Sequence, residues 1–310
     1  MKLKDKTRAK IDESIFLIAI LAIPLIQVII FYIGVNFNSI LLSVQEMDPE
    51  SGEFHFLRIG NVFGNYGAAI KDLFDANSNV GWILRNAVVN SAVQFAFSIL
   101  SLVISIIASY FIWKKVPMYG FFQVIVFLPS IISNIVFVLM ARYFLENAMP
   151  QLFGIDFNFF AADKQFYTIL FFGVWLGFAT GMVVFLGAMS GIDEELIEYG
   201  QLEGLSAFKE FFWVVIPGIF PTITTYIIAT LAGYFTNKGH FYSFFGSDTT
   251  GLFAESNYTL GYFFFHKVVG QDSSSFFPYA SAYGIMFTLI LVPLTLFTKH
   301  MLEKYGPSAE

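Results

Sequence analysis

Carboxylate side chains gather in one segment of the chain, residues 191–212, and a pair of carboxylates can serve as general acid and general base. Glu198 and Glu203 are the candidate pair. They are five residues apart, so a helix would place them on different faces, and nothing in the sequence implies a pocket between them. Catalysis at this segment is therefore not expected. A docking surface for another protein is the better interpretation, because a short helix with an apolar stripe can fit a groove.

The segment itself predicts two short helices joined by a tight turn, and we refer to residues 191–212 as the acidic elbow. Asp193 suits the N-cap of the first helix, and Gly204 suits the left-handed residue that ends it. Ser206 can cap the second helix, which leads into an apolar stretch. The apolar stripe of the first helix consists of Leu196, Tyr199 and Leu202, and the second helix carries Phe208, Phe211 and Phe212.

Uncharged polar side chains lie within the apolar parts of the chain. They suit a neutral, hydroxyl-rich solute better than an ion, although hydrogen bonding between helices explains any single one of them equally well. Six are candidates for lining a solute pathway: Asn90, Gln94, Asn134, Tyr226, Thr230 and Tyr234.

The elements that must position these side chains are membrane-spanning helices. A span takes about 20 mostly apolar residues, which cross roughly 30 Å of hydrocarbon. Six windows qualify, and the second is long enough to tilt or to begin outside the membrane. The windows cover residues 14–33, 82–113, 118–141, 166–189, 213–235 and 279–297. The predicted fold class is an all-α integral membrane protein with six transmembrane helices, in which the acidic elbow joins spans four and five.

Two patterns within the windows concern helix packing and movement. Gly173, Gly177 and Gly181 form two successive small-xxx-small steps on one face, which lets another helix approach closely. Pro217 and Pro221 each remove a backbone hydrogen bond at the start of the fifth span, so they predict a hinge.

The composition also indicates a membrane protein. Of the 310 residues, 56% are hydrophobic and only 13% are charged, whereas soluble domains carry about 25% charged residues. The chain has no Cys, which excludes thiolate chemistry, and its net charge of −6 gives no basis for nucleic-acid binding. It lacks a phosphate-binding loop of the G-x-x-x-x-G-K-[ST] type. Energy for active transport would therefore come from a partner.

The distribution of Lys and Arg predicts the orientation in the membrane. Short segments on one side carry most of these residues, which places both termini in the cytoplasm. The expected organisation is a cytoplasmic N-terminus (1–13), a first span (14–33), an extracytoplasmic loop (34–81), a five-span core (82–298) and a cytoplasmic tail (299–310).

Two other classes of protein stay open at this point. A secondary carrier or channel would transport without ATP, but such carriers usually place a charged residue near the bilayer midplane, and no window does so. A membrane-embedded enzyme acting on lipids would need clustered His, Asp or Glu near an interface, and the sequence shows no such constellation.

The acidic elbow resembles the EAA loop of ABC importer permeases. Glu198 matches the acid of that motif, Gly204 its invariant glycine and Pro217 its closing proline, while Tyr199 and Gly200 stand where the family has two alanines. The resemblance implies that residues 190–212 form coupling helices that dock into a cleft on a cytoplasmic ATPase. The docking residues that it implies are Glu198, Tyr199, Gly200, Glu203, Gly204, Leu205 and Phe208.

The resemblance extends over nearly the whole chain. Phe63-Gly64-Asn65-Tyr66, Phe127-Leu128-Pro129-Ser130 and Tyr279-Ala280-Ser281-Ala282 are similar to recurring pieces of the carbohydrate-uptake, maltose-permease-like branch. It implies a non-catalytic permease subunit in a bacterial inner membrane, importing a sugar or oligosaccharide. The implied partners are a second permease subunit, two ATPase subunits that hold ATP and Mg²⁺, and an extracytoplasmic solute-binding protein. This chain itself would hold no cofactor or metal. A permease of the same kind for a non-sugar solute is the alternative.

Overall fold

The computed structural model describes residues 14, 16–18, 20–154, 157–246, 252–270 and 274–307. The predicted cytoplasmic N-terminus (1–13) therefore lies outside the described residues. The chain divides into two compact units. Unit 1 comprises Met1–Lys71 and Ser273–Met286, and unit 2 comprises Asp72–Asp272 and Phe287–Glu310.

Unit 1 contains the first candidate span, Phe16–Ser43, which includes a π-helical stretch and then α2 (Val35–Ser43). A hairpin of β1 (Gln45–Met47) and β2 (Phe54–Phe56) follows, with Gln45 paired to Phe56. The hydroxyl of Tyr66 donates to Ser43 Oγ at 2.8 Å, which ties the start of α3 (Gly64–Phe74) to the end of α2. The first turns of α14 (Phe277–Tyr305) join the same unit, because the hydroxyl of Tyr283 donates to the carbonyl of Ala69.

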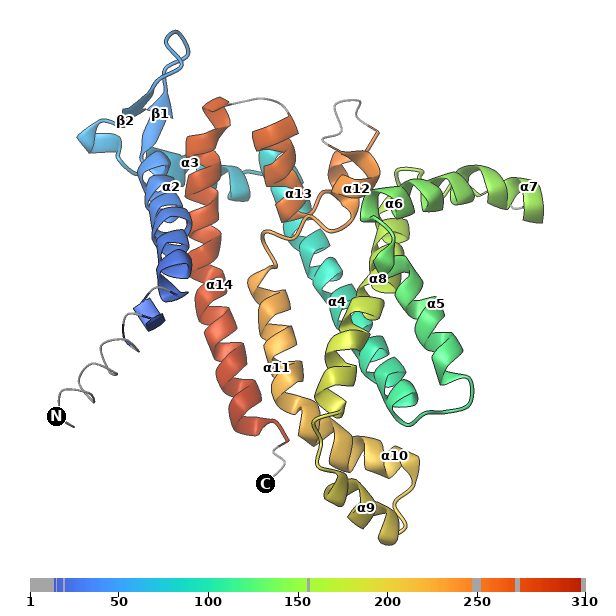
Figure 1. Cartoon of the computed structure of the whole chain (residues 1–310). Coiled ribbons are helices and arrows are strands. Elements are labelled where there is room, and N and C mark those ends of the chain that lie inside the picture. The colour runs from blue at the N-terminus through green and yellow to red at the C-terminus, as the bar shows by residue number, and fades with distance from the viewer. Residues whose placement is uncertain are drawn as a thin grey trace, which may run out of the picture. The chain divides into compact units, whose positions relative to one another are not determined.

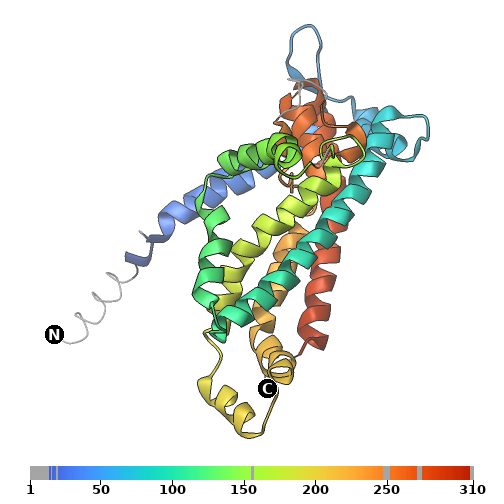
Figure 2. The same ribbon diagram turned by 90° about the vertical axis from the view of Figure 1, so that its right-hand side faces the viewer.

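Unit 2 holds the remaining helices, and α4, α8 and α11 lie against one another in it (Figures 1 and 2). In chain order they are α4 (Asn79–Trp113), α5 (Tyr119–Ile131), α6 (Asn134–Tyr143), α7 (Met149–Phe153), α8 (Gln165–Met189), α9 (Glu194–Leu202), α10 (Ala207–Glu210), α11 (Ile216–Ala232), α12 (Phe241–Phe245), α13 (Leu260–Phe265) and the rest of α14. Three π-helical segments interrupt them, at Phe144–Ala148, Phe211–Val215 and His266–Gly270.

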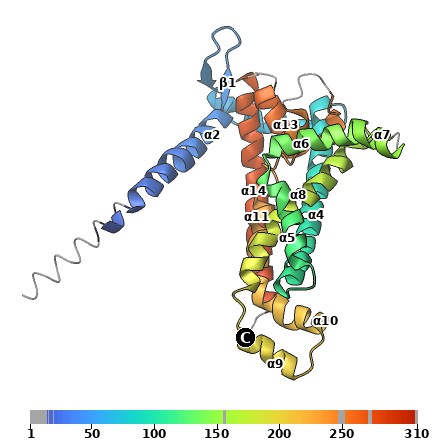
Figure 3. The ribbon, with the colours of Figure 1, turned by 45° about the vertical axis from the view of Figure 1, so that its right-hand side comes forward.

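A buried apolar cluster joins α4, α8 and α11 at the end of unit 2 that carries the acidic elbow. Its members are Leu102, Ile106, Tyr110, Phe185, Met189, Val215, Ile219 and Ile223. Figure 3 shows α9 and α10 beyond the ends of these helices, while α6, α7, α12 and α13 lie at the opposite end of the unit. The elbow therefore projects from one end of a packed helical bundle.

The structure supports five of the six predicted transmembrane helices and leaves the third unconfirmed. Five helices in the described residues are long and apolar enough to cross a membrane: Phe16–Ser43, Asn79–Trp113, Gln165–Met189, Ala207–Ala232 and Ser274–Tyr305. They correspond to five of the six predicted windows.

The predicted third span, residues 118–141, is instead two shorter helices, α5 and α6. Ile132 and Ser133 between them are extended, with ψ of 142° and 129°. Pro129 lies three residues before this break and lacks the amide hydrogen that would bond to the preceding turn. Hydropathy does not predict this break, because the residues on both sides of it are apolar. In the structure, α6 runs in a different direction from α5 (Figure 1).

Candidate functional site

The acidic elbow is built by local capping interactions, as its sequence predicts. Asp193 Oδ1 accepts a hydrogen bond from the amide of Glu195 at 3.1 Å at the start of α9. The acidic first turn of α9 is favoured by the helix dipole. Gly204 has a φ of +76°, which is the left-handed conformation expected at the end of this helix. Ser206 Oγ then accepts from the amide of Lys209 at 3.5 Å and begins α10.

Large apolar side chains of the elbow and of the turn that follows it are exposed. The exposed fractions are 48% for Leu196, 64% for Tyr199, 87% for Leu202, 74% for Phe208, 50% for Phe212 and 77% for Trp213. Glu198 and Glu203 are exposed beside them. These two carboxylates therefore flank an open apolar surface and do not line a pocket.

Gly200, one of the two departures from the EAA pattern, is buried at a close contact within the elbow. A Cβ atom at this position would lie 2.9 Å from Leu205 Cδ1. The backbone bond from the amide of Leu205 to the carbonyl of Gly200, 3.0 Å long, closes the turn across it. The missing side chain of Gly200 thus makes room for Leu205 to fold back onto α9.

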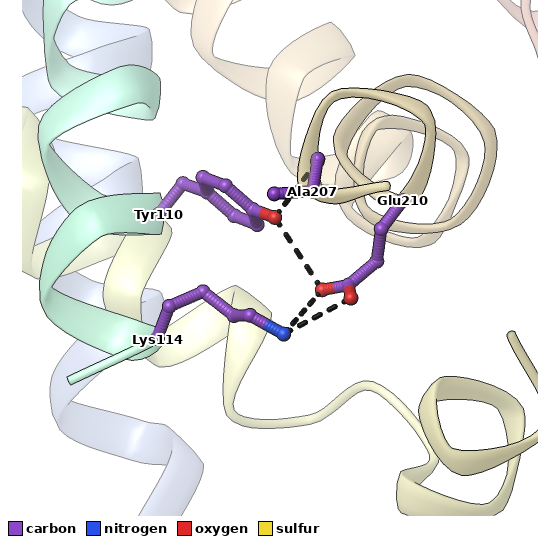
Figure 4. Close-up of polar contacts among 4 residues, drawn as sticks. All are labelled: Tyr110, Lys114, Ala207 and Glu210. Carbon is purple, nitrogen blue, oxygen red and sulfur yellow. Dashed lines mark hydrogen bonds and ion pairs between the residues drawn. The ribbon is translucent and has the colours of Figure 1, made fainter. Parts of the chain in front are cut away.

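An ion pair and a tyrosine hold the elbow to the end of α4 (Figure 4). Lys114 Nζ lies 2.8 Å and 3.0 Å from the two carboxylate oxygens of Glu210, and Glu210 is only 4% exposed. The hydroxyl of Tyr110 donates to the carbonyl of Ala207 at 2.9 Å and also lies 3.4 Å from Glu210 Oε1. This anchor was not predicted from the sequence, because Lys114 and Glu210 are 96 residues apart and no local pattern links them.

The two proline residues of the predicted hinge lie in α11. Pro217 is in its first turn and Pro221 is inside it, and the π-helical segment Phe211–Val215 comes directly before. The carbonyl of Pro221 accepts from Thr225 Oγ1 at 2.9 Å. The structure thus shows an irregular helix start here, and movement at this point stays a prediction.

The glycine stripe of α8 lies against α4 and its neighbours. A Cβ atom at Gly177 would lie 2.9 Å from Ser101 Oγ, and one at Gly181 would lie 2.5 Å from Ser105 Oγ. Gly173 faces the ring of His240 instead. Opposite the stripe, α4 carries serines four residues apart whose hydroxyls donate to carbonyls of α8. The pairs are Ser101 with Val174, Ser105 with Phe178 and Ser109 with Met182.

The spacing of these serines in the sequence indicates that one face of α4 is made of small residues. Ser101, Ser105 and Ser109 repeat every four residues, so they share one face of α4, as the three glycines share one face of α8. Small residues let the backbones approach, and the hydroxyls then reach the facing carbonyls.

A cavity of about 250 Å³ lies between α4, α8, α11 and the segment before α12. Two of the six predicted pathway residues, Gln94 and Tyr226, line it. Its other polar lining residues are Ser98, Ser101, Asn237 and His240. Burial lowers the pKa of His240 below its usual value, so this side chain is neutral at pH 7. The polar part of the lining is therefore uncharged, and the rest is apolar.

The other four predicted pathway residues have hydrogen-bond partners elsewhere. Asn90 Nδ2 donates to the carbonyls of Ser256 and Tyr258, and Asn134 Nδ2 donates to Ser243 Oγ. Thr230 Oγ1 donates to the carbonyl of Tyr226 in its own helix. The hydroxyl of Tyr234 donates to the carbonyl of Val88 at 2.8 Å. The structure does not bring these four together with Gln94 and Tyr226 as one lining.

The fold is that of a chain found in solved ABC importers. Over 97% of its length the chain matches 99% of a chain in the crystal structure of a bacterial ABC transporter involved in the import of the acidic polysaccharide alginate, with a TM-score of 0.73 and 20% identity. A second structure of the bacterial alginate ABC transporter, in complex with an alginate pentasaccharide-bound periplasmic protein, matches with a TM-score of 0.67 and 19% identity. With its five candidate spans, the chain is a multi-pass membrane protein with the architecture of an ABC importer permease.

Sequence comparison points to the same class. The chain is 27% identical to a probable ABC transporter permease of Mycoplasma genitalium, over 49% of this chain and 48% of that protein. It is 23% identical to the maltose/maltodextrin transport system permease MalF of Klebsiella aerogenes, over 46% of this chain and 30% of that one. The matches span about half of these relatives or less, and no family model matches the chain. The similarity is thus to permeases of ABC transporters, among them carbohydrate importers.

Proposed function

We infer that this chain is a permease subunit of an ATP-driven importer of a sugar or oligosaccharide, and that its acidic elbow docks an ATPase. In this proposal the chain forms half of the translocation pathway and a second permease subunit forms the other half. Two ATPase subunits bind and hydrolyse ATP with Mg²⁺, and an extracytoplasmic binding protein delivers the solute. The chain itself is non-catalytic, and both of its termini are cytoplasmic.

The observation that carries the docking proposal is the exposed apolar surface of the acidic elbow. Tyr199, Leu202 and Phe208 have between 64% and 87% of their surface exposed, on a segment held in one shape by two caps and a left-handed glycine. An apolar helix face of this kind is what a groove on a partner protein binds. Because Glu198 and Glu203 flank this face, the proposed groove carries positive charge at its rim.

Carbohydrate is the proposed solute class because two features agree on it. Some relatives transport maltose and maltodextrin, and the structural neighbours import alginate. The cavity lined by Gln94 and Tyr226 offers amide, hydroxyl and aromatic groups without a charge, which suits a neutral sugar, as in the maltose relatives, better than an acidic polysaccharide such as alginate. Its volume of about 250 Å³ is below the roughly 300–1,000 Å³ of sites for drug-sized ligands, so in this conformation it would hold only part of an oligosaccharide.

Co-purification from native membranes tests the docking proposal. We expect the wild-type chain to retain an ABC ATPase, and we expect Glu198→Arg and Gly204→Val to lose it while still inserting in the membrane, because a β-branched residue at position 204 does not adopt a φ of +76°. Glu50→Arg is the matched control, because Glu50 is exposed in the hairpin turn of unit 1, which we propose to lie on the other side of the membrane. Equal ATPase recovery with all of these variants would contradict docking at the elbow.

Uptake into proteoliposomes tests the transport class and the solute. The reconstituted complex should take up a sugar only when ATP is supplied on the side of the ATPase. Uptake without ATP or ATPase would indicate a secondary carrier. A panel of sugars, oligosaccharides and non-sugar solutes then identifies the substrate class.

A further inference from the structure

The acidic elbow is connected to the helical bundle in two ways, and each could transmit a movement of the elbow. One route is covalent, because α10 continues through the π-helical segment Phe211–Val215 into α11. The second is the contact between α10 and the end of α4 that Figure 4 shows. The covalent route is a continuous helix, Ala207–Ala232, but a π-helical stretch and two prolines, Pro217 and Pro221, weaken its backbone hydrogen bonding near the start of α11.

The contact with α4 is built to resist displacement. Glu210 is nearly fully buried, and both of its carboxylate oxygens contact Lys114. A buried carboxylate is costly without a paired cation, so separation of the two side chains is strongly opposed. Lys114 also lies 5.7 Å from the centre of the Trp113 ring. An exposed surface ion pair would offer little such resistance.

Tyr110 extends the same contact along the elbow. Its hydroxyl donates to the carbonyl of Ala207, the first residue of α10, and its ring meets the ring of Phe211 edge to face at 4.9 Å. These contacts hold α10, which is the first turn of the helix that continues through Phe211–Val215 into α11, against the end of α4. Tyr110, Lys114 and Glu210 thus fix α10 against α4, and we call these three residues the α4 strut.

From α4 the connection continues into α8. The serines of α4 donate to carbonyls of α8 over three successive turns, at 3.4 Å from Ser101, 3.1 Å from Ser105 and 3.0 Å from Ser109. Glycines on α8 keep the two backbones close. Contacts of this kind favour movement of α4 and α8 as one rigid pair. This pair also supplies much of the lining of the cavity, including Gln94 and Ser98 of α4 and Gly177 of α8.

We propose that the α4 strut is the coupling element that transmits movement of the elbow to the α4–α8 pair, so that Lys114, Glu210 and Tyr110 are positioning residues for transport. This inference rests on the proposed function, since the movement comes from the ATPase docked on the elbow. It separates two roles within the elbow. The exposed face around Tyr199 holds the ATPase, and the buried side at Glu210 carries the force into the bundle.

The test compares ATP hydrolysis and solute uptake in proteoliposomes containing the whole importer. Glu210→Gln and Lys114→Met keep the size of the side chains and remove the ion pair. We expect both variants to retain the ATPase on co-purification and to lower the uptake per ATP hydrolysed by roughly tenfold, a usual size for coupling between sites. The charge exchange Lys114→Glu with Glu210→Lys should recover part of the loss, because it restores an ion pair at the same place. Unchanged retention of the ATPase in the single variants separates a loss of coupling from a loss of folding.

Two further variants sharpen the test. Tyr110→Phe keeps the ring against Phe211 and removes the bond to Ala207, so a smaller loss of coupling is expected. Lys299→Met with Glu303→Gln is the matched control. This ion pair, 3.7 Å long, also lies at the elbow end of unit 2, but its side chains are 51% and 57% exposed and it joins residues of one helix. The control should keep the wild-type ratio of uptake to hydrolysis.

A chemical cross-link provides an independent measurement. The chain has no Cys, so Lys114→Cys with Glu210→Cys introduces the only two thiols, and a short reducible thiol cross-linker can replace the ion pair with a covalent link. We expect the unlinked double variant to be uncoupled, the cross-linked one to regain coupling, and reduction to abolish it again.

The outcomes distinguish this inference from the proposed function. If Glu210→Gln and Lys114→Met keep the wild-type uptake per ATP, the strut does not couple and the inference is overturned, whereas docking stands. Loss of the ATPase with these two variants would also overturn it, because the anchor would then serve docking alone. A wild-type chain that retains no ATPase would refute the proposed function and this inference with it.

Discussion

Gly181→Ala is the substitution for which the structure makes the sharpest prediction. Gly181 is buried in α8, and its added Cβ would lie 2.5 Å from Ser105 Oγ and 3.0 Å from Ser105 Cβ. The hydroxyl of Ser105 cannot turn away freely, because it donates to the carbonyls of Ser101 at 2.7 Å and Phe178 at 3.1 Å. The two helices must therefore separate to admit one methyl group.

The expected cost follows from two contributions. Overpacking of a closely packed contact costs about 1–3 kcal/mol. Loss of the interhelical bond from Ser105 adds about 0.6 kcal/mol, the average for such bonds in membrane helices. Gly187→Ala is the matched control in the same helix, because nothing lies within 4 Å of its added Cβ. Both variants gain the same helix propensity, so they should differ in the free energy of unfolding by about 2–4 kcal/mol.

The assay is the midpoint of thermal unfolding of the purified protein in detergent. At roughly 1.5 °C per kcal/mol for a chain of 310 residues, Gly181→Ala should melt about 3 °C or more below Gly187→Ala. Adding Ser105→Gly to Gly181→Ala removes the side chain that the new methyl group would contact. The double variant should therefore recover most of the overpacking cost. Equal midpoints for Gly181→Ala and Gly187→Ala, or no recovery in the double variant, would refute the inferred packing of α4 on α8.

Three further predictions concern the elbow, the cavity and pH. Gly204→Ala must adopt a φ of +76°, at a cost of about 1–2 kcal/mol, so it should weaken retention of the ATPase on co-purification. Gly204→Asn should retain more of the ATPase than Gly204→Ala does, because Asn tolerates that conformation. Tyr226→Ala should change the uptake kinetics of an importer that assembles as the wild type does, because Tyr226 lines the cavity. Tyr234→Phe should lower the free energy of unfolding by about 1 kcal/mol, through loss of the bond to Val88, and leave uptake unchanged. The reverse pattern would exclude the cavity from the pathway. Burial holds the pKa of His240 below its usual 6.5, so the unfolded chain takes up the proton first as the pH falls. The contribution of His240 to stability should therefore be complete above about pH 6.5 and decrease below it. The thermal midpoint of His240→Asn should depend less on pH below about 6.5 than that of the wild type. The same pH dependence in both proteins would show that His240 does not contribute.

Much of the elbow and of the span positions could be predicted because the signals are local. Asp193 and Ser206 cap helices whose first turns follow them directly, and Gly204 adopts its conformation within a single turn. Five of the six apolar windows correspond to long helices, since about 20 apolar residues satisfy their own backbone hydrogen bonds as a helix wherever they lie. Only the window over 118–141 differs, where extended residues Ile132 and Ser133 interrupt an otherwise apolar stretch.

The partners of individual side chains required the tertiary structure. Asn90 and Gln94 lie one helical turn apart in α4 and carry the same amide group. Asn90 nevertheless donates to the carbonyls of Ser256 and Tyr258, while Gln94 lines a cavity. Which of the two roles a polar side chain takes depends on the helix it meets, and hydropathy carries no information on which faces meet.

Composition, helix caps and apolar length act within a few residues of the chain, and they suffice to make it a charge-poor, helical membrane protein with one acidic elbow. Among the six acids of that elbow, only the contacts between helices distinguish Glu210, which turns inward to Lys114, from Glu198 and Glu203, which stay exposed. The physical reason is that a buried carboxylate needs a cation at the same place, and only the packing of α10 on α4 brings one there.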